Sequence, residues 1–420
     1  MEQFTVTSRQ RTIMFIMMGI GVLSMLLTWI TDSDPLHTRF WANFLLNTVF
    51  FTGISLIGLF GIAAFVCTYT GWFIVFKRIW EAYSMFIIVG LGLMLIIVAG
   101  IWGNFHHIYH WSDAHSVAED KILAGKSSFL SPGFYTAITL LFMLVSYWIA
   151  RRIRSLSLDE DVNKTADYEQ YRKIKYLSAI YLPIFGFISV VVIWQWLMSI
   201  DPHWFSTMYA WYVTVSWFDA MLCLTILIVI SLKSKGYLEF VTNEHLQDLG
   251  KYLFAFSIFW TYLWFGQYML IWYSNNGEET TYFNTRIVQY PVMFWGILII
   301  NFLLPFLVLM RNDTKRKVGI MTFVAATVFF GHYMDFHLMV MPGALHTAHE
   351  LSGHAVDAAT NHHEAVSHFK MGFTIPGLLE IGNLIGFLGL FLLFTKNQMA
   401  KASLVPKNDP FLGESIHHHV

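Results

Sequence analysis

The sequence predicts an all-α integral membrane protein with about ten transmembrane helices: two four-helix bundles plus two peripheral helices, with both termini cytoplasmic. The first reason is composition, since 56% of the 420 residues are hydrophobic and 13% are charged, whereas soluble domains average about 25% charged residues. The second is a mean hydropathy of +0.54. The third is that long apolar runs recur along the chain, with cationic residues gathered in alternate connections between them.

Ten apolar runs are long enough to cross roughly 30 Å of hydrocarbon. We expect them at 12–31, 41–66, 82–103, 131–150, 177–200, 205–232, 251–274, 290–310, 318–341 and 374–395. The first run follows Arg9 and Arg11 and is longer than the apolar core of a secretory signal, so we interpret it as a retained helix. The connections are short except for 104–130, 151–176 and 342–373.

The distribution of charge predicts the orientation. Of the 26 Lys and Arg residues, 21 lie in the two terminal segments and in the connections on their side. Cytoplasmic segments of membrane proteins are enriched in Lys and Arg, so both termini are expected in the cytoplasm, in agreement with an even number of helices.

A faint internal repeat supports the two bundles. Asp34-Pro35 and Asp201-Pro202 each precede a histidine and an aromatic-rich segment that enters a helix from the outer side, as in a parallel repeat. The expected divisions are an N-terminal tail and peripheral helix over 1–40, a first bundle over 41–200, a second bundle over 201–341, a His-rich outer loop over 342–373, and a peripheral helix with a cytoplasmic tail over 374–420.

Several classes of function are disfavoured. The net charge of −1 suggests no surface for nucleic acid. The two cysteines, Cys67 and Cys223, form no CxxC or CxxCH motif, so neither a disulfide framework nor a sulfur-ligated redox centre is expected. The outer loop holds His346, His349, His354, His362, His363 and His368. No HExxH motif or fixed spacing accompanies them, so we interpret the loop as partner-facing or pH-sensitive rather than as a metal site.

Charged side chains inside the predicted spans are the candidate functional residues. Asp219 lies fourteen residues into its span, near the bilayer centre, where a charge costs roughly 2.5–3.5 kcal/mol. Asp335 and Glu380 each lie six residues from the outer end of a span, roughly 9 Å deep, and His332 shares a helix face with Asp335. A carboxyl group removed from water can hold or release a proton near neutral pH. We therefore predict that Asp219, His332, Asp335 and Glu380 are titrating stations of a proton path.

Two amides are expected to hydrogen-bond or hold water beside these groups, namely Asn383, three residues after Glu380, and Gln267. The alternative interpretation is that the buried polar groups only bind the helices together through hydrogen bonds. Lys77 and Arg78, at the inner end of the third span, are interpreted as anchors that extend toward the membrane–water interface.

Three stretches resemble a known family. They are "HTRFWANFLLNTVFFTGISLIGLFG" (His37–Gly61), "SIDPHWFSTMYAWY" (Ser199–Tyr212) and "VTNEHLQDLGKYLFAFSIFWTYLWFGQYMLIWYSNNGEET" (Val241–Thr280). They look like the second large membrane subunit of bacterial alternative complex III, which is similar to the polysulfide-reductase membrane anchors (NrfD-like). The likeness covers most of the chain, and Val241–Thr280 is its most specific part.

The resemblance implies a quinol:cytochrome c oxidoreductase of the bacterial inner membrane that replaces the bc1 complex. It implies haem c and iron–sulfur clusters in partner subunits, so this chain would bind no cofactor or metal of its own, with quinol as a possible ligand. The implied partners are a paralogous NrfD-like subunit, an iron–sulfur subunit, multihaem and monohaem c-type cytochromes, small membrane subunits, lipids and, as a further candidate, a terminal oxidase. Proton translocation is proposed for the family, and Asp219, Asp335 and Glu380 suit it by position.

We therefore expect a subunit that is not catalytic alone, that supports quinol oxidation and that forms part of a proton-translocation path. Two alternatives stay open, a purely structural anchor of the same complex and a stand-alone secondary transporter. A transporter usually has Gly- or Pro-broken helices at the midplane. Pro183 and Pro305 fall near the ends of predicted spans, which argues against it.

Overall fold

The structure, a computed structural model, describes residues 3–32, 34–163, 167–353 and 375–419, and every regular element in these ranges is a helix. Ten candidate membrane spans occur in them, as predicted. These are α1 (Ser8–Thr31), α2 (Thr38–Cys67), α3 (Lys77–Ser84) continued by α4 (Ile87–Trp102), α7 (Pro132–Val162), α8 (Glu169–Trp196), α9 (Tyr209–Lys233), α10 (Asn243–Ser274), α12 (Pro291–Leu298) continued by α13 (Leu304–Leu309), α15 (Val318–Gly353) and α17 (Leu378–Met399). The fold is that of a multi-pass membrane protein.

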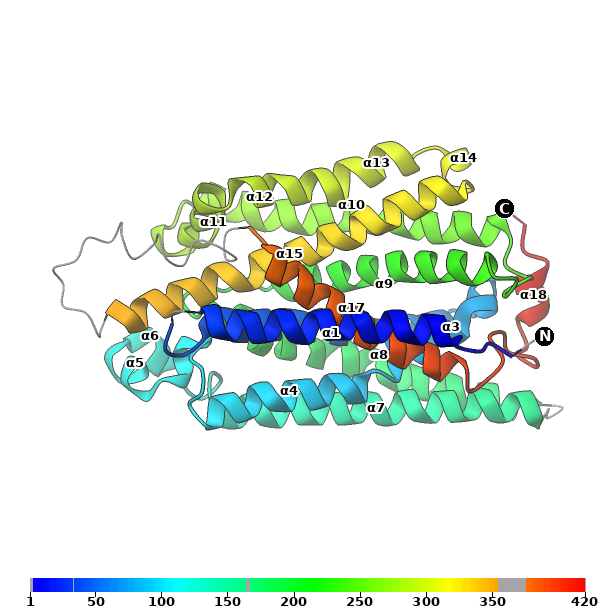
Figure 1. Ribbon diagram of the computed structural model, residues 1–420, viewed down its shortest axis with the longest axis horizontal. Helices are drawn as coiled ribbons and strands as arrows, with labels where there is room; N and C mark the ends of the chain where they lie inside the picture. The colour runs from blue at the N-terminus through cyan, green and yellow to red at the C-terminus, as the bar shows by residue number, and fades with distance from the viewer. Residues whose placement is uncertain (1–2, 33, 164–166, 354–374, 420) are drawn as a thin grey trace.

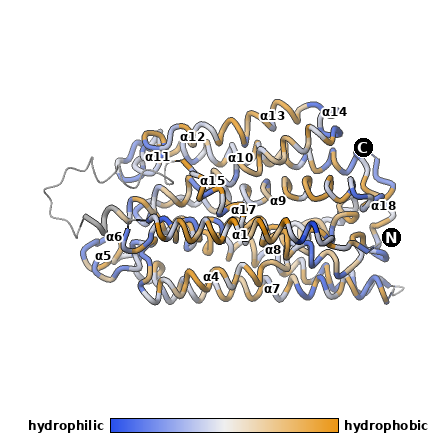
Figure 2. Tube along the Cα trace, in the orientation of Figure 1, coloured by the Kyte–Doolittle hydropathy of each residue, from blue (hydrophilic) through white to orange (hydrophobic). Residues whose placement is uncertain are grey.

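The long helices run along one axis, and both chain termini lie at the same end of it (Figure 1). We call this the terminal end; it also holds the short helices α14 (Asn312–Lys315) and α18 (Leu412–Ile416). The opposite end, here the loop end, holds α5 (Ala114–Glu119), α6 (Lys121–Lys126) and α11 (Gly277–Gln289). Apolar residues dominate the middle of the helices and polar residues gather at both ends (Figure 2).

Helices α2 and α9 lie at the centre and are buried over most of their length. Helix α2 packs on α3, α4, α8, α9 and α15, and α9 packs on α8, α10 and α15. The crossing of α2 and α9 depends on Gly53, because a Cβ there would lie 1.9 Å from the indole of Trp217. These two central helices are therefore shielded from lipid by the others.

Helix α1 packs mainly along α17 at the periphery. Their backbones nearly touch where Gly21 meets Gly386, since a Cβ added to Gly386 would lie 2.3 Å from the Gly21 Cα. Gly382 and Gly389 continue the same face of α17. Small residues allow such close approach of membrane helices, where van der Waals packing replaces the hydrophobic effect as the source of association.

Several helices extend beyond the predicted spans, and α7, α8 and α15 change the predicted connections most. Helix α7 continues to Val162 and α8 begins at Glu169, so most of the predicted 151–176 connection is helical. Helix α15 continues through Pro342 to Gly353, so the predicted loop over 342–373 begins as helix, and its residues 354–373 lie outside the described ranges. The α7 and α8 extensions alternate buried and exposed residues, so their mean hydropathy is too low for them to be recognised as spans.

One of the two prolines is placed differently from the expectation, while Pro305 lies near the end of the span Pro291–Leu309 as predicted. Pro183 lies inside α8 rather than near its end, and Pro305 follows a π-helical turn at Ile299–Leu303 that interrupts the span. The argument from proline position against a transporter therefore fails for Pro183, which lies in the middle of its helix.

Candidate functional site

Asp219 of α9 faces His332 of α15. Both side chains are fully buried, and the His332 Nε2 lies 3.5 Å from Asp219 Oδ2. Neither carboxyl oxygen of Asp219 accepts a hydrogen bond from a described residue. The packing of α9 on α15 therefore brings together two of the predicted residues and places the imidazole of His332 beside the carboxyl of Asp219.

The other imidazole nitrogen leads to Asp335. His332 Nδ1 lies 2.8 Å from the hydroxyl of Ser216, which also donates to Asp335 Oδ2 at 3.1 Å. Trp260 Nε1 donates to the same oxygen at 3.0 Å, and the hydroxyl of Tyr212 donates to Oδ1. Three donors thus converge on one fully buried carboxyl group.

Sequence reasoning missed Tyr212, Ser216 and Trp260. A usable signal was present in α9, because Tyr212, Ser216 and Asp219 are spaced i, i+4 and i+7 and so share one helix face. Trp260 gave no such signal among the many aromatic residues of α10.

Gln267 joins the cluster through a small cavity. The cavity has a volume of about 30 Å³, and both Gln267 and Asp335 line it. Gln267 Oε1 accepts a hydrogen bond from Ser206 at 3.0 Å. A space of at least 10–15 Å³ with polar partners is enough for one water molecule. The cavity can therefore hold one or two waters beside Asp335.

A larger pocket of about 310 Å³ opens at the loop end. Its lining includes His110, Asp201, His203, Glu278 and His346. Tyr282 and Arg286 of α11 line both this pocket and the small cavity, so they form the wall between the two.

Arg286 is held in that wall from several sides. Its NH2 pairs with Asp201 Oδ2 at 2.9 Å, and its guanidinium lies 3.3 Å from the centre of the Tyr282 ring, which stacks on Trp204. Burial lowers the pKa of Arg286, but attraction to Tyr282 and Asp201 outweighs burial and raises it. The guanidinium is therefore a fixed cation. Sequence reasoning missed it because it belongs to an amphipathic connection rather than to a span.

Pro342 explains one further contact of Arg286. Proline has no N–H, so the carbonyl four residues earlier, at Leu338, loses its helical donor. Arg286 Nε donates to that carbonyl at 3.0 Å. This bond lets α15 pass through Pro342 without leaving Leu338 O unsatisfied.

Glu380 and Asn383 do not join this cluster. Glu380 Oε1 pairs with Arg39 NH2 at 2.7 Å, and its Oε2 accepts the Gly377 backbone N–H at 2.9 Å, which caps α17. Asn383 is buried without a hydrogen-bond partner among the described residues. Glu380 and Asp335 also do not lie at the equal depth that was predicted for them. Glu380 is the third residue of α17, whereas Asp335 lies 18 residues before the end of α15. The structure thus separates Glu380 from the other three predicted stations.

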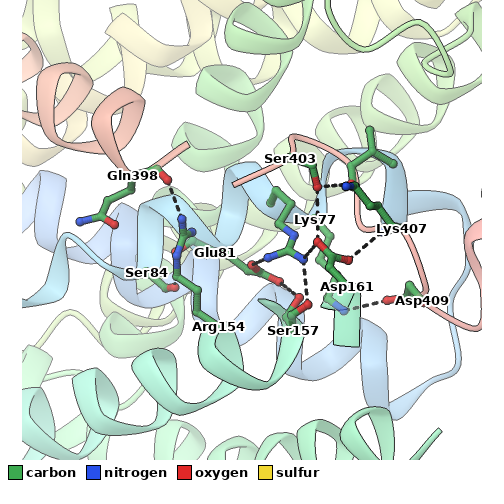
Figure 3. A network of polar contacts seen from close by, with 12 residues as sticks. Lys77, Glu81, Ser84, Arg154, Ser157, Asp161, Gln398, Ser403, Lys407 and Asp409 are labelled. Carbon is green, nitrogen blue, oxygen red and sulfur yellow. Dashed lines mark hydrogen bonds and ion pairs between the residues drawn. The ribbon is translucent and has the colours of Figure 1, made fainter. Parts of the chain in front are cut away.

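A charged cluster at the terminal end was also missed (Figure 3). Lys77 pairs with Asp409 at 2.8 Å, with both side chains fully buried. Arg78 pairs with Asp161 at 2.7 Å and is likewise buried. The interpretation of Lys77 and Arg78 as interfacial anchors is therefore wrong, because the C-terminal tail folds over them and supplies Asp409. A local reading of the sequence cannot detect a partner more than 300 residues away.

No group of three or more His, Cys, Asp or Glu side chains suited to a metal ion occurs within the described ranges. His354, His362, His363 and His368 of the His-rich tract lie outside those ranges. The prediction about that loop therefore stays a prediction.

Comparison with protein-family models gives no match for this chain, and comparison with curated proteins gives none either.

Proposed function

We propose that the chain is a cofactor-free membrane subunit of a quinol-oxidising respiratory complex of the alternative complex III kind, in the bacterial inner membrane. The resemblance of His37–Gly61, Ser199–Tyr212 and Val241–Thr280 supports this, and the ten candidate spans agree with it. In this proposal the terminal end faces the cytoplasm, because most Lys and Arg residues belong to it, and the loop end faces the cytochrome subunits.

The proposed organisation has two four-helix bundles. Helices α2, α3–α4, α7 and α8 form the first, and α9, α10, α12–α13 and α15 form the second, with α1 and α17 peripheral. The contacts α7 with α8, α2 with α8, α9 with α15 and α12 with α15 support this grouping.

The observation that supports a role in proton transfer is the row of polar groups from the loop end to the middle of α9. It begins at the outer pocket, passes the Tyr282–Arg286 wall into the small cavity, and reaches Asp335. From Asp335, Ser216 and His332 lead to Asp219. Glu380, which pairs with Arg39 and accepts a hydrogen bond from Asn43 Nδ2 at 3.4 Å, has no part in this row.

The donors and acceptors in the row define where a proton can reside. Ser216 has one hydroxyl proton and donates it to Asp335, so His332 Nδ1–H donates to the Ser216 oxygen. The lone pair of His332 Nε2 then points toward Asp219 Oδ2. A proton shared between these two atoms completes the row, and its movement to Asp335 requires the imidazole and the Ser216 hydroxyl to exchange their donor roles.

The row is an outer half-path. No described hydrogen bond leads from Asp219 toward the terminal end, so Asp219 is its inner end. We propose that it exchanges protons between the membrane centre and the cytochrome side during quinol oxidation.

The test is the Asp219→Asn variant of the assembled complex, reconstituted in liposomes and supplied with quinol and cytochrome c. Because neither oxygen of Asp219 accepts a described hydrogen bond, the isosteric amide breaks none. Electron transfer is expected to continue while the number of protons translocated per electron falls. Asp335→Asn is expected to act in the same direction.

The matched control is Glu380→Gln, which also removes a buried carboxylate but lies outside the row. It is expected to lower the yield of assembled complex and to leave the proton-to-electron ratio unchanged. An unchanged ratio in Asp219→Asn, or an equal fall in all three variants, would contradict the half-path.

A purely structural anchor is the second candidate, and the Arg39–Glu380 and Lys77–Asp409 pairs favour it, since both join segments far apart in sequence. An anchor predicts that Asp219→Asn changes assembly without changing the number of protons translocated per electron.

Purification of the chain with its native partners tests whether the chain belongs to such a complex. Haem-containing subunits should copurify with it, and solute transport by the isolated chain would instead indicate a secondary transporter.

A further inference from the structure

An open groove of about 430 Å³ lies between the last turns of α7 and the first turns of α8, at the terminal end. Its polar lining consists of Arg152 from α7 and of Glu169, Arg172 and Lys173 from α8. The groove lies outside the centres of the two proposed bundles, and it shares no residue with the row of polar groups from the outer pocket to Asp219.

The groove has more positive than negative charge. Lys173 pairs with Glu169 at 2.5 Å. Within the described ranges, neither Arg152 nor Arg172 forms an ion pair with an acidic side chain, and both are exposed. The groove therefore holds two guanidinium groups and one ammonium group against a single carboxylate, that of Glu169, which pairs with Lys173. Guanidinium groups bind phosphate oxygens through paired, charge-assisted hydrogen bonds.

Apolar side chains continue from each arginine toward the middle of the molecule. On α7, Trp148 and Leu144 lie one and two turns from Arg152 on the same helix face, with exposed fractions of 60% and 49%. On α8, Tyr176 and Ile180 stand in the same relation to Arg172, and both are exposed. Each cationic side chain is thus followed by an exposed apolar stripe along a candidate membrane span.

We propose that this groove binds the headgroup phosphate of an anionic phospholipid, with the acyl chains lying along the α7 and α8 stripes. Basic pockets between membrane helices on the cytoplasmic side bind such headgroups. Tyr176 and Trp148 belong to the side-chain types that favour the headgroup level. The apolar stripes select a lipid over free phosphate, and the exposed, lipid-facing position of the groove favours a lipid over an acidic protein segment.

The experiment compares lipid retention by the full complex in nanodiscs that contain phosphatidylcholine with either phosphatidylglycerol or cardiolipin. Native mass spectrometry counts the anionic lipids that stay bound. The double variant Arg152→Gln/Arg172→Gln is expected to weaken retention about thirtyfold, since each basic residue near an anionic headgroup contributes about fivefold. The charge-matched control is Arg9→Gln/Arg11→Gln, which removes two exposed cations at the same end of the molecule and is expected to change nothing.

Two further measurements distinguish a bound phospholipid from free phosphate and from a neighbouring polypeptide. Inorganic phosphate added in excess is not expected to displace the lipid, whereas displacement would identify a free-anion site. A photo-reactive residue in the variant Tyr176→p-benzoylphenylalanine is expected to cross-link to phospholipid. Cross-linking to a neighbouring polypeptide, or equal retention by the wild type and the Arg152→Gln/Arg172→Gln variant, would overturn the proposal.

Discussion

His106 shows how burial sets the charge of a single residue outside the spans. Its imidazole is 1% exposed and packs on Trp41, with ring centroids 4.6 Å apart. Burial lowers the pKa of His106 to about 4, although the contact between Nε2 and the Ile97 carbonyl at 3.2 Å raises it in part. The ordinary pKa of histidine is about 6.5. The folded protein therefore resists protonation of His106 where the unfolded chain accepts it.

This difference predicts a pH dependence of stability. As the pH falls below about 6.5, the unfolded chain binds a proton at this histidine and the folded protein does not, so stability is lost until the pH reaches about 4. Between pH 7.5 and pH 5 the loss is about 2 kcal/mol. Thermal unfolding of the His106→Gln variant in detergent should therefore depend less on pH over this interval. A fall in Tm equal to that of the wild type would contradict the prediction.

At the same scale, the sequence predicted some site residues and not others. Asp219, His332 and Asp335 were identified because an ionisable group in an apolar run is expensive to bury. Tyr212, Ser216 and Trp260 are ordinary residues of membrane helices, so their role becomes visible only when α9, α10 and α15 are packed together.

At the scale of elements, α1 depends on its contact with α17. The backbones of Gly21 and Gly386 are so close that a methyl group at either position meets the other main chain, which cannot rotate away as a side chain can. Beyond this contact, α1 has many exposed apolar residues and few neighbours.

Gly386→Leu is therefore expected to separate α1 from α17 and to lower the stability by at least about 1–3 kcal/mol, the range for overpacking. Gly19→Leu is the matched control, because a Cβ at Gly19 has no atom within 4 Å. Tm in detergent measures the effect, and protease accessibility of the N-terminal segment shows whether α1 has detached. Equal Tm values for the two variants would show that the close approach is not needed.

The number of long helices could be predicted from hydropathy, but their ends could not. The last turns of α7 bury Ile153, Leu156 and Glu160 while exposing Arg151 and Asp159. This pattern is amphipathic, so its average hydropathy resembles that of a loop. The ends of such helices are determined by the groups they pack on, which here include the C-terminal tail.

At the scale of the whole molecule, the C-terminal tail joins distant helices at the terminal end. Asp409 pairs with Lys77, and the Lys407 backbone N–H donates to Asp161 Oδ1 at 2.7 Å. The Ser415 carbonyl lies 2.9 Å from Nε2 of His245. The tail therefore connects α3, α7 and α10.

Asp409→Asn is expected to lower the stability of the protein by about 3–5 kcal/mol, because it leaves the buried cation of Lys77 without its counter-charge. The double variant Lys77→Met/Asp409→Leu removes both charges and should recover most of the loss, since apolar replacement of a buried pair is often neutral or stabilising. Unfolding by heat in detergent distinguishes the two. A double variant as unstable as the single one would show that the tail contributes through its shape and not through this pair.

The bond between Arg286 and the Leu338 carbonyl has a mechanical consequence. Because Pro342 leaves that carbonyl without a helical donor, the guanidinium is tied to α15 one turn before the proline. A displacement of α15 at this turn would therefore also displace the cation that lies between the open pocket and the small cavity. The same hydrogen bond therefore fixes both the path of α15 through its proline and the position of the guanidinium between the two cavities.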